Sequence, residues 1–101
     1  MKISYDELIK KINNHEISNV EFGIADYQHY SNCRIEVNKE LINNKLIVII
    51  EVKLTNDLSE YESFYNRFDE SYKLFNLGRK GSFTLKQIWD KVTIKSINYY
   101  Q

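Results

Sequence analysis

The sequence has no proline, three glycines and a single cysteine among its 101 residues. One cysteine excludes an internal disulfide, so the fold has to rest on an apolar core. The chain is long enough for one such core, and we expect a single domain over residues 1–101. Cys33 alternates with Ile35 and Val37, which is typical of a buried thiol and not of a nucleophile.

Neither sign of charge is in excess. Lysine and arginine together number 14, as do aspartate and glutamate, which leaves a net charge of zero. Because binding to nucleic acid usually needs a basic face, this balance disfavours a general nucleic-acid-binding function. No apolar run approaches the roughly 20 residues of a membrane-spanning helix, and residues 1–3 lead directly into a charged segment rather than a signal peptide. We therefore expect a cytoplasmic protein with no membrane partner.

The most apolar stretch covers residues 46–54 and is rich in β-branched residues, which favours a strand. Its even-numbered positions are all apolar, so one face of this strand should be buried along its whole length. On the other face, Ile47 and Ile49 should also be buried, whereas Glu51 and Lys53 place charges near the end. This pattern predicts an interior strand of a small sheet.

Two strands are predicted before it, over residues 18–26 and 33–41, because apolar residues alternate there. Gly23 indicates a bulge or the close approach of another group. Asn43 and Asn44 tolerate positive φ and predict a two-residue hairpin turn.

That turn predicts the pairing of residues 33–41 with residues 46–54. It places apolar residues opposite one another, namely Val37 with Ile50, Ile35 with Val52 and Cys33 with Leu54. It also places Glu36 opposite Glu51 and Arg34 opposite Lys53. The two diagonals, Arg34–Glu51 and Glu36–Lys53, then join opposite charges within reach of long side chains.

Helices are predicted on both sides of these strands. Residues 4–7 form a capping box before a helix over residues 5–14. Spacings of three and four predict a long helix over residues 58–77, with an apolar stripe made of Leu58, Tyr61, Tyr65, Phe68, Tyr72 and Phe75. Residues 84–87 form a second capping box before a short third helix, and residues 92–99 should be a strand.

The predicted order is α-β-β-β-α-α-β. It corresponds to an α+β fold of two layers, in which helices pack on one face of a small, mainly antiparallel sheet of about four strands. The last strand could pair at an edge or beside the central strand.

Glu51-Val52-Lys53, with Asp26 upstream, resembles the motif of restriction-endonuclease-like nucleases. The resemblance implies two acids that hold Mg²⁺ and a lysine that activates water or stabilises charge. Arg34 and Glu36 offer a structural alternative, a charge quartet on an open sheet face. His15 and His29 have no partner at metal-ligand spacing, and no cofactor motif is present. We therefore expect no catalytic residue, no metal and no cofactor.

Two segments are candidates for binding a protein partner. The loop over residues 26–32 combines a charge with aromatic and imidazole side chains, as Asp26, Tyr27, His29 and Tyr30. The outer face of the long helix would be acidic through Glu60, Glu62, Asp69 and Glu70, and could meet a basic partner. The basic connector at Arg79 and Lys80 is either a solvated turn or, as an alternative, part of a nucleic-acid-binding module.

The length, the expected compartment, the lack of a catalytic constellation and the abundance of Ile, Asn, Lys and Tyr resemble those of bacterial toxin-immunity proteins of the contact-dependent growth inhibition type. The resemblance implies a non-enzymatic protein that binds a cognate toxin domain, most often a nuclease, and covers its active site. It assigns no functional residue, and it leaves the oligomeric state open.

Overall fold

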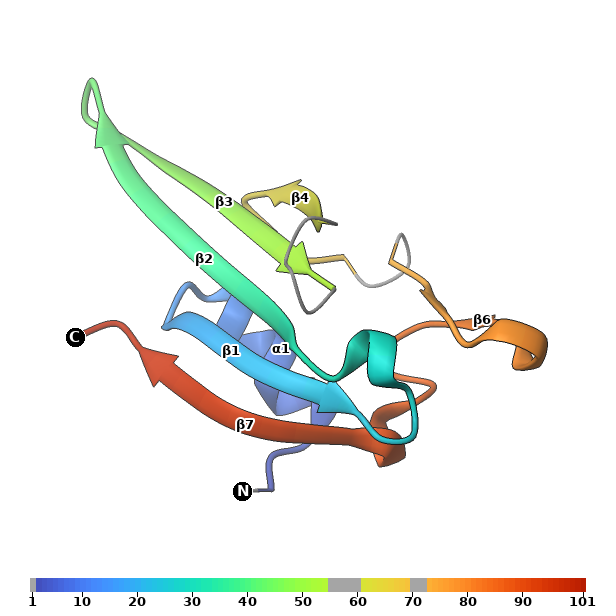
Figure 1. The fold of residues 1–101 in the computed structure, drawn as a ribbon. Helices are drawn as coiled ribbons and strands as arrows, with labels where there is room; N and C mark the ends of the chain where they lie inside the picture. Colours follow the sequence, from blue (N-terminus) through green and yellow to red (C-terminus); the bar gives the residue numbers. More distant parts are fainter. Residues whose placement is uncertain (1, 55–60, 70–72) are drawn as a thin grey trace.

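A computed structural model describes residues 2–54, 61–69 and 73–101 (Figure 1). Helix α1 (Tyr5–Asn13) precedes strands β1 (Ile17–Ile24), β2 (Cys33–Ile42), β3 (Lys45–Lys53), β4 (Tyr61–Tyr65) and β7 (Val92–Tyr99). These strands form one five-stranded sheet in the order β4-β3-β2-β1-β7, and every neighbouring pair is antiparallel. Strands β5 (Phe75–Asn76) and β6 (Ser82–Phe83) form a separate two-stranded sheet. Short 3₁₀ turns are η1 (Gln28–Tyr30), η3 (Gly78–Lys80) and η4 (Trp89–Lys91).

The predicted α+β fold with helices layered on about four strands is wrong, because strands predominate and α1 is the one α-helix of the described residues. Within the described part of residues 58–77, β4 pairs with β3 and β5 pairs with β6 where a long helix was predicted. The apolar spacing led to a wrong prediction of helix, because residues four positions apart lie on one face of a strand as well as of a helix. Tyrosine and phenylalanine also favour strands. Residues 58–60 and 70–72 of the predicted helix lie outside the described residues.

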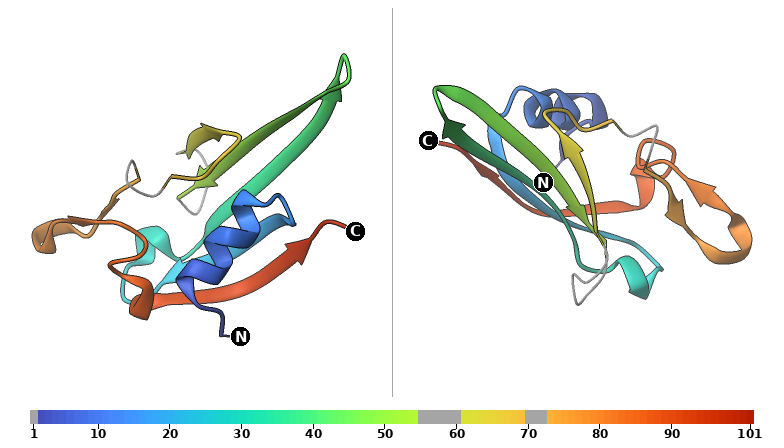
Figure 2. Two further views of the ribbon diagram at one scale, coloured as in Figure 1. Left: turned by 180° about the vertical axis from the view of Figure 1, so that it is seen from behind. Right: turned by 90° about the horizontal axis from the view of Figure 1, so that it is seen from above.

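The prediction of the first helix is confirmed. The Ser4 side chain accepts a hydrogen bond from the Glu7 amide at 3.1 Å, as the capping box requires. Tyr5, Leu8 and Ile12 are buried, and α1 lies across one face of the sheet (Figure 2). We call this covered face the inner face and the opposite one the outer face.

Asn13, the last residue of α1, fixes the segment after β4 against the helix. Its Oδ1 accepts from the Phe68 amide at 2.7 Å, and its Nδ2 donates to the Phe68 carbonyl at 3.3 Å. Phe68 is buried, and its ring packs edge-on against Phe64 of β4 at 5.3 Å. The inner face is therefore covered by α1 and by this segment.

The predicted hairpin register is confirmed. Val37 pairs with Ile50, Ile35 with Val52, Glu36 with Glu51 and Arg34 with Lys53. Asn43 and Asn44 have φ values of 52° and 65°, which suit a two-residue turn with left-handed residues. The alternation buries the core residues of the inner face, including Val20, Phe22, Ile35, Val37, Val48, Ile50 and Val52.

The end of the chain agrees with the predictions only in part. The capping box over residues 84–87 forms, since the Thr84 amide donates to Gln87 Oε1 at 2.8 Å and the Gln87 amide donates to Thr84 Oγ1 at 3.3 Å. The predicted short third helix is wrong, because turns and η4 follow instead. Strand β7 takes the edge position and pairs with β1. No helix in the described ranges is long and apolar enough to cross a membrane.

Candidate functional site

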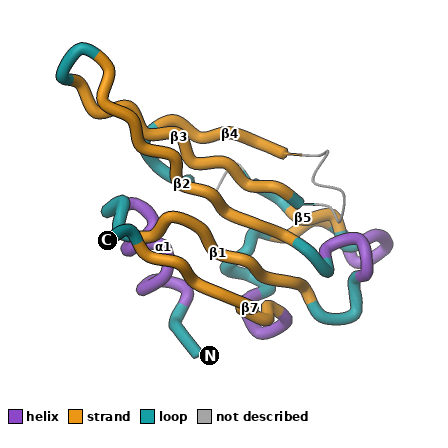
Figure 3. Tube along the Cα trace, turned by 60° about the vertical axis from the view of Figure 1, so that its left-hand side comes forward, coloured by secondary structure: helices purple, strands orange, loops and turns teal. Residues whose placement is uncertain are grey.

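Strands β2 and β3 extend past the rest of the sheet and end in a projecting hairpin tip, residues 41–46 (Figure 1, Figure 3). Leu41 and Leu46 face each other there and are 76% and 53% exposed. Ile42 is 49% exposed. Three large apolar side chains therefore stand in solvent at the end of a regular two-stranded arm.

Leu41 and Leu46 point to the inner face, and further exposed apolar side chains lie on the outer face. Ile49 of β3 lies opposite Tyr65 of β4, and the two are 40% and 66% exposed. Tyr61, at the other end of β4, is 58% exposed. The predicted burial of Ile47 and Ile49 is therefore wrong, because Ile47 is only half-buried and no helix of the described residues covers the outer face.

Among the described residues, six of the nine exposed large hydrophobic residues belong to this hairpin and its neighbour β4. We call them the apolar surface: Leu41, Ile42, Leu46, Ile49, Tyr61 and Tyr65. Sequence reasoning missed the surface, because it placed Tyr61 and Tyr65 in a helix core and Ile49 in a buried strand. One signal was available in Leu41 and Ile42, which directly precede the Asn-Asn turn, since hairpin turns are usually exposed.

A charge network lies on the outer face beside the apolar surface. Arg34 pairs with Glu36 at 3.0 Å and with Glu21 at 3.4 Å, and Lys53 pairs with Glu36 at 3.2 Å. The predicted diagonal Glu36–Lys53 is therefore confirmed, whereas Arg34 turns to Glu21 and Glu36 instead of Glu51. Partial burial alone would raise the pKa of Glu36, but the hydrogen bonds and charges of Arg34 and Lys53 lower it below its ordinary value.

The acids of the nuclease motif are not brought together. Glu51 lies on β3, whereas Asp26 follows β1, and β2 runs between those two strands. Lys53 pairs with Glu36, which supports the structural alternative of a charge network. Among the described residues, no three His, Cys, Asp or Glu side chains are placed to hold one metal ion.

The loop over residues 26–32 contributes to the core and to a cleft. Tyr30 is buried, accepts a hydrogen bond from the Asn76 amide at 3.2 Å and packs edge-on against Phe75 at 5.4 Å. It is therefore a core residue. His29 is exposed and lies edge-on to the Tyr30 ring at 4.8 Å. Asp26 is exposed and has a φ of 68°.

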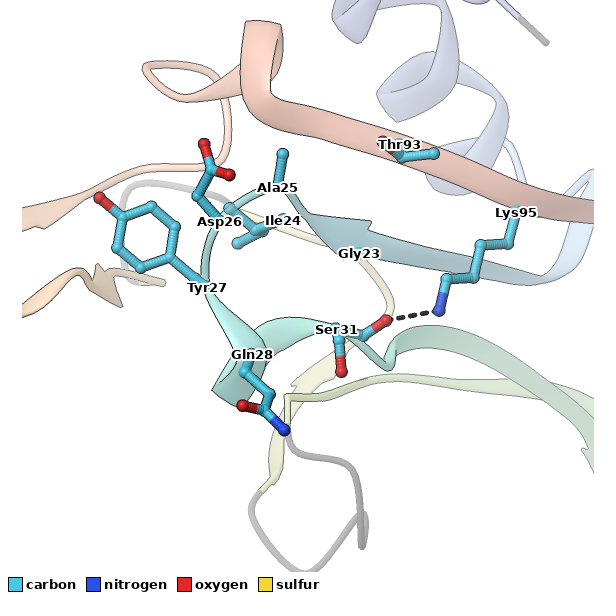
Figure 4. A pocket seen from close by; sticks show the side chains of 9 residues that line it. All are labelled: Gly23, Ile24, Ala25, Asp26, Tyr27, Gln28, Ser31, Thr93 and Lys95. Atoms are coloured by element: carbon cyan, nitrogen blue, oxygen red, sulfur yellow. Dashed lines mark hydrogen bonds between the residues drawn. The ribbon is translucent and has the colours of Figure 1, made fainter.

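A cleft of about 580 Å³ opens between this loop and β7 (Figure 4). Asp26 and Tyr27 lie at one side of it, and Lys95 crosses the other side to donate hydrogen bonds to the Ser31 carbonyl and to Asn32 Oδ1. Gly23 forms part of the cleft wall, and a Cβ atom there would lie 2.8 Å from the Ser31 carbonyl oxygen. The predicted close approach at Gly23 is thus confirmed.

The predicted acidic helix face is not formed. Glu62 lies on β4 and pairs with Lys73 at 3.4 Å, and Asp69 is exposed beyond the strand. Glu60 and Glu70 lie outside the described residues. Glu62 and Asp69 therefore share no helix face.

Cys33 is the buried thiol that its alternation predicts. Its Sγ is directed toward the carbonyl groups of Tyr30 and Leu54, at 3.5 and 3.4 Å. Burial raises the pKa of the Cys33 thiol to about 12, against the opposing effect of the charges on Lys95 and Lys73. A thiolate, the form that reacts as a nucleophile, is therefore scarce near neutral pH.

No protein-family model matches this chain, and no curated protein or solved structure matches it at significant similarity. Its function therefore has to be inferred from its own residues. Of the surfaces described above, the apolar surface has the composition and the prominence of a protein-binding site.

Proposed function

We propose that this chain is a non-enzymatic binding protein of the immunity or inhibitor class, which binds and neutralises a cognate bacterial toxin domain. The apolar surface carries the proposal. Contiguous exposed apolar groups are costly in water, and on folded proteins they mark interaction sites. Here six of them gather on one hairpin and one adjoining strand, where they occupy both faces of the sheet.

The chemistry of the surface suits protein recognition. Tyr61 and Tyr65 can each bury a large ring on binding while the hydroxyl groups stay hydrated. Leu41 and Leu46 are held on paired strands, because the β2–β3 ladder continues to Ile42 opposite Lys45. A pre-ordered arm loses little conformational entropy when it binds, which favours tight association.

The projecting hairpin also suggests how a toxin would be inhibited. The described residues extend over 47 × 26 × 24 Å, and the hairpin tip lies at one end of the long shape (Figure 2). A narrow apolar arm can enter a concave site, where it excludes water and substrate together. In our proposal the hairpin tip covers the active site of the toxin domain, and a nuclease remains the expected toxin.

Growth rescue tests the proposal. We expect the gene immediately upstream to encode a toxin domain, and co-expression of this chain should restore the growth of cells that express it. The Leu46→Asp substitution should abolish the rescue, because it places a charge in the apolar contact that the hairpin tip would make. A chain that fails to rescue growth, or an upstream gene without a toxin domain, would contradict the immunity function.

Leu74→Asp is the matched control. Leu74 is 50% exposed, close to the 53% of Leu46, but it lies next to β5 and away from the hairpin tip. This variant should rescue growth like the unmodified chain. Urea unfolding of both variants would show whether a loss of rescue comes from the interface or from the fold. Equal loss of rescue in both variants would move the interface away from the hairpin tip.

A further inference from the structure

Glu51 occupies a distinctive place on the outer face. Ser63 of β4 lies directly opposite it, and Tyr61 and Tyr65 lie two residues to either side of Ser63 on the same face. Serine has a small side chain, and the exposed Tyr61 and Tyr65 occupy the two diagonal positions. The result is a carboxylate framed by two aromatic side chains.

The charge of Glu51 is not balanced within the described part of the chain. Its Oε1 accepts one hydrogen bond, from Asn38 Nδ2 at 3.1 Å. The neighbouring cations are already engaged, since Arg34 pairs with Glu21 and Glu36 and Lys53 pairs with Glu36. Arg34 and Lys53 thus pair with two other acids, and the negative charge of Glu51 has no ion-pair partner among the described residues.

We infer that Glu51, between Tyr61 and Tyr65, binds an arginine side chain of the partner protein. This inference rests on the proposed function and specifies the chemistry of the partner. A guanidinium group is planar and weakly hydrated, forms directed hydrogen bonds to a carboxylate and stacks on aromatic rings. Each tyrosine face adds a cation–π attraction. The site therefore matches arginine in charge, shape and surroundings.

Because the arginine site adjoins the apolar surface, apolar contact with the partner would strengthen the ion pair at Glu51. Tyr61 and Tyr65 belong both to the arginine site and to the apolar surface, and Tyr65 lies directly opposite Ile49. When the apolar contact excludes water from the Tyr65 ring, the ion pair at Glu51 becomes less screened and stronger. Arginine and tyrosine are the residue types that most often dominate the energy of such interfaces.

Titration with two blocked tripeptides tests the inference without a partner protein. Acetyl-Gly-Arg-Gly-amide is the probe, and acetyl-Gly-citrulline-Gly-amide is its neutral analogue of nearly the same shape. We expect the arginine peptide to shift the backbone amide NMR signals of residues 49–51 and 61–65, with an affinity about fivefold higher than that of the citrulline peptide.

Two variants test whether the Glu51 carboxylate is responsible for the preference for the arginine peptide. Glu51→Gln should remove the preference for arginine over citrulline, because it removes the charge and keeps the shape. Glu40→Gln changes an exposed acid of β2 that lies on the same outer face of the sheet as Glu51, and it should retain the preference. Equal affinities for the two peptides, signal changes elsewhere or no change at all would overturn the inference. Growth rescue by the unmodified chain tests the proposed function separately, so the two failures can be told apart.

Discussion

The base and the tip of the β2–β3 hairpin contain the same kinds of residue in opposite surroundings. At the base, Val37 and Ile50 pair on the inner face and are 1% and 0% exposed. At the tip, Leu41 and Leu46 pair on the same face and are 76% and 53% exposed. Residues of α1 and the segment after β4 cover the base, and nothing in the described residues covers the tip. The apolar side chains at the base therefore stabilise the fold, whereas those at the tip are available to a partner.

The largest effect that follows from this comparison is a difference in stability. Ile50→Ala should lower the free energy of unfolding by about 2–5 kcal/mol, because it removes buried methyl groups and leaves a cavity. Leu46→Ala should change it by only about 0.5 kcal/mol or less, as is usual for an exposed site. Urea titrations followed by circular dichroism measure both values. Similar losses in the two variants would show that the tip is part of the core.

A smaller effect is expected at Gly23, which is buried where β1 lies against the loop over residues 26–32. Gly23→Ala should lower the free energy of unfolding by about 1–3 kcal/mol, since the new Cβ atom overpacks the site. The clash is with the backbone carbonyl of Ser31, which cannot move aside like a flexible side chain. Thr93→Ala, at the paired position of β7, is the control and should be close to neutral. A neutral Gly23→Ala would mean that the loop over residues 26–32 yields easily.

The smallest effect concerns the charge network on the outer face. The pKa of Glu36 is below its ordinary value of 4.5, so the folded state favours the ionised form. This contribution to stability is present above about pH 4.5 and is lost as the pH falls through the pKa of the folded state. Glu36→Gln should therefore cost about 1 kcal/mol or less near neutral pH, and the cost should shrink in acid. Unfolding midpoints at several pH values would show this, and a cost independent of pH would contradict it.

The base of the hairpin could be predicted from the sequence because local signals agree there. The alternation in β2 and β3 and the Asn-Asn turn specify one register, and that register is observed. The segment over residues 61–65 could not be predicted in the same way. Tyr61 and Tyr65 are four residues apart, a spacing that both a helix and a strand place on one face.

The exposure of the side chains in the candidate site was harder to predict than the hairpin register. The exposed fraction of a side chain depends on which distant segments pack against it. The sequence alone cannot say that α1 covers the base of the hairpin and stops short of Leu41. Tyr30 differs from Leu41 in the opposite direction: it was expected to be exposed in a loop, but it is buried against Phe75, far along the chain. Both outcomes follow from tertiary packing and not from local pattern.

Hydrogen–deuterium exchange on the complex with the toxin domain tests the division between base and tip most directly. If the tip is the binding surface, partner binding should slow exchange over residues 41–49 and 61–65 and leave the loop over residues 26–32 unchanged. Protection of that loop without protection of the hairpin tip would contradict the account and place the partner at the cleft beside Asp26 and Tyr27.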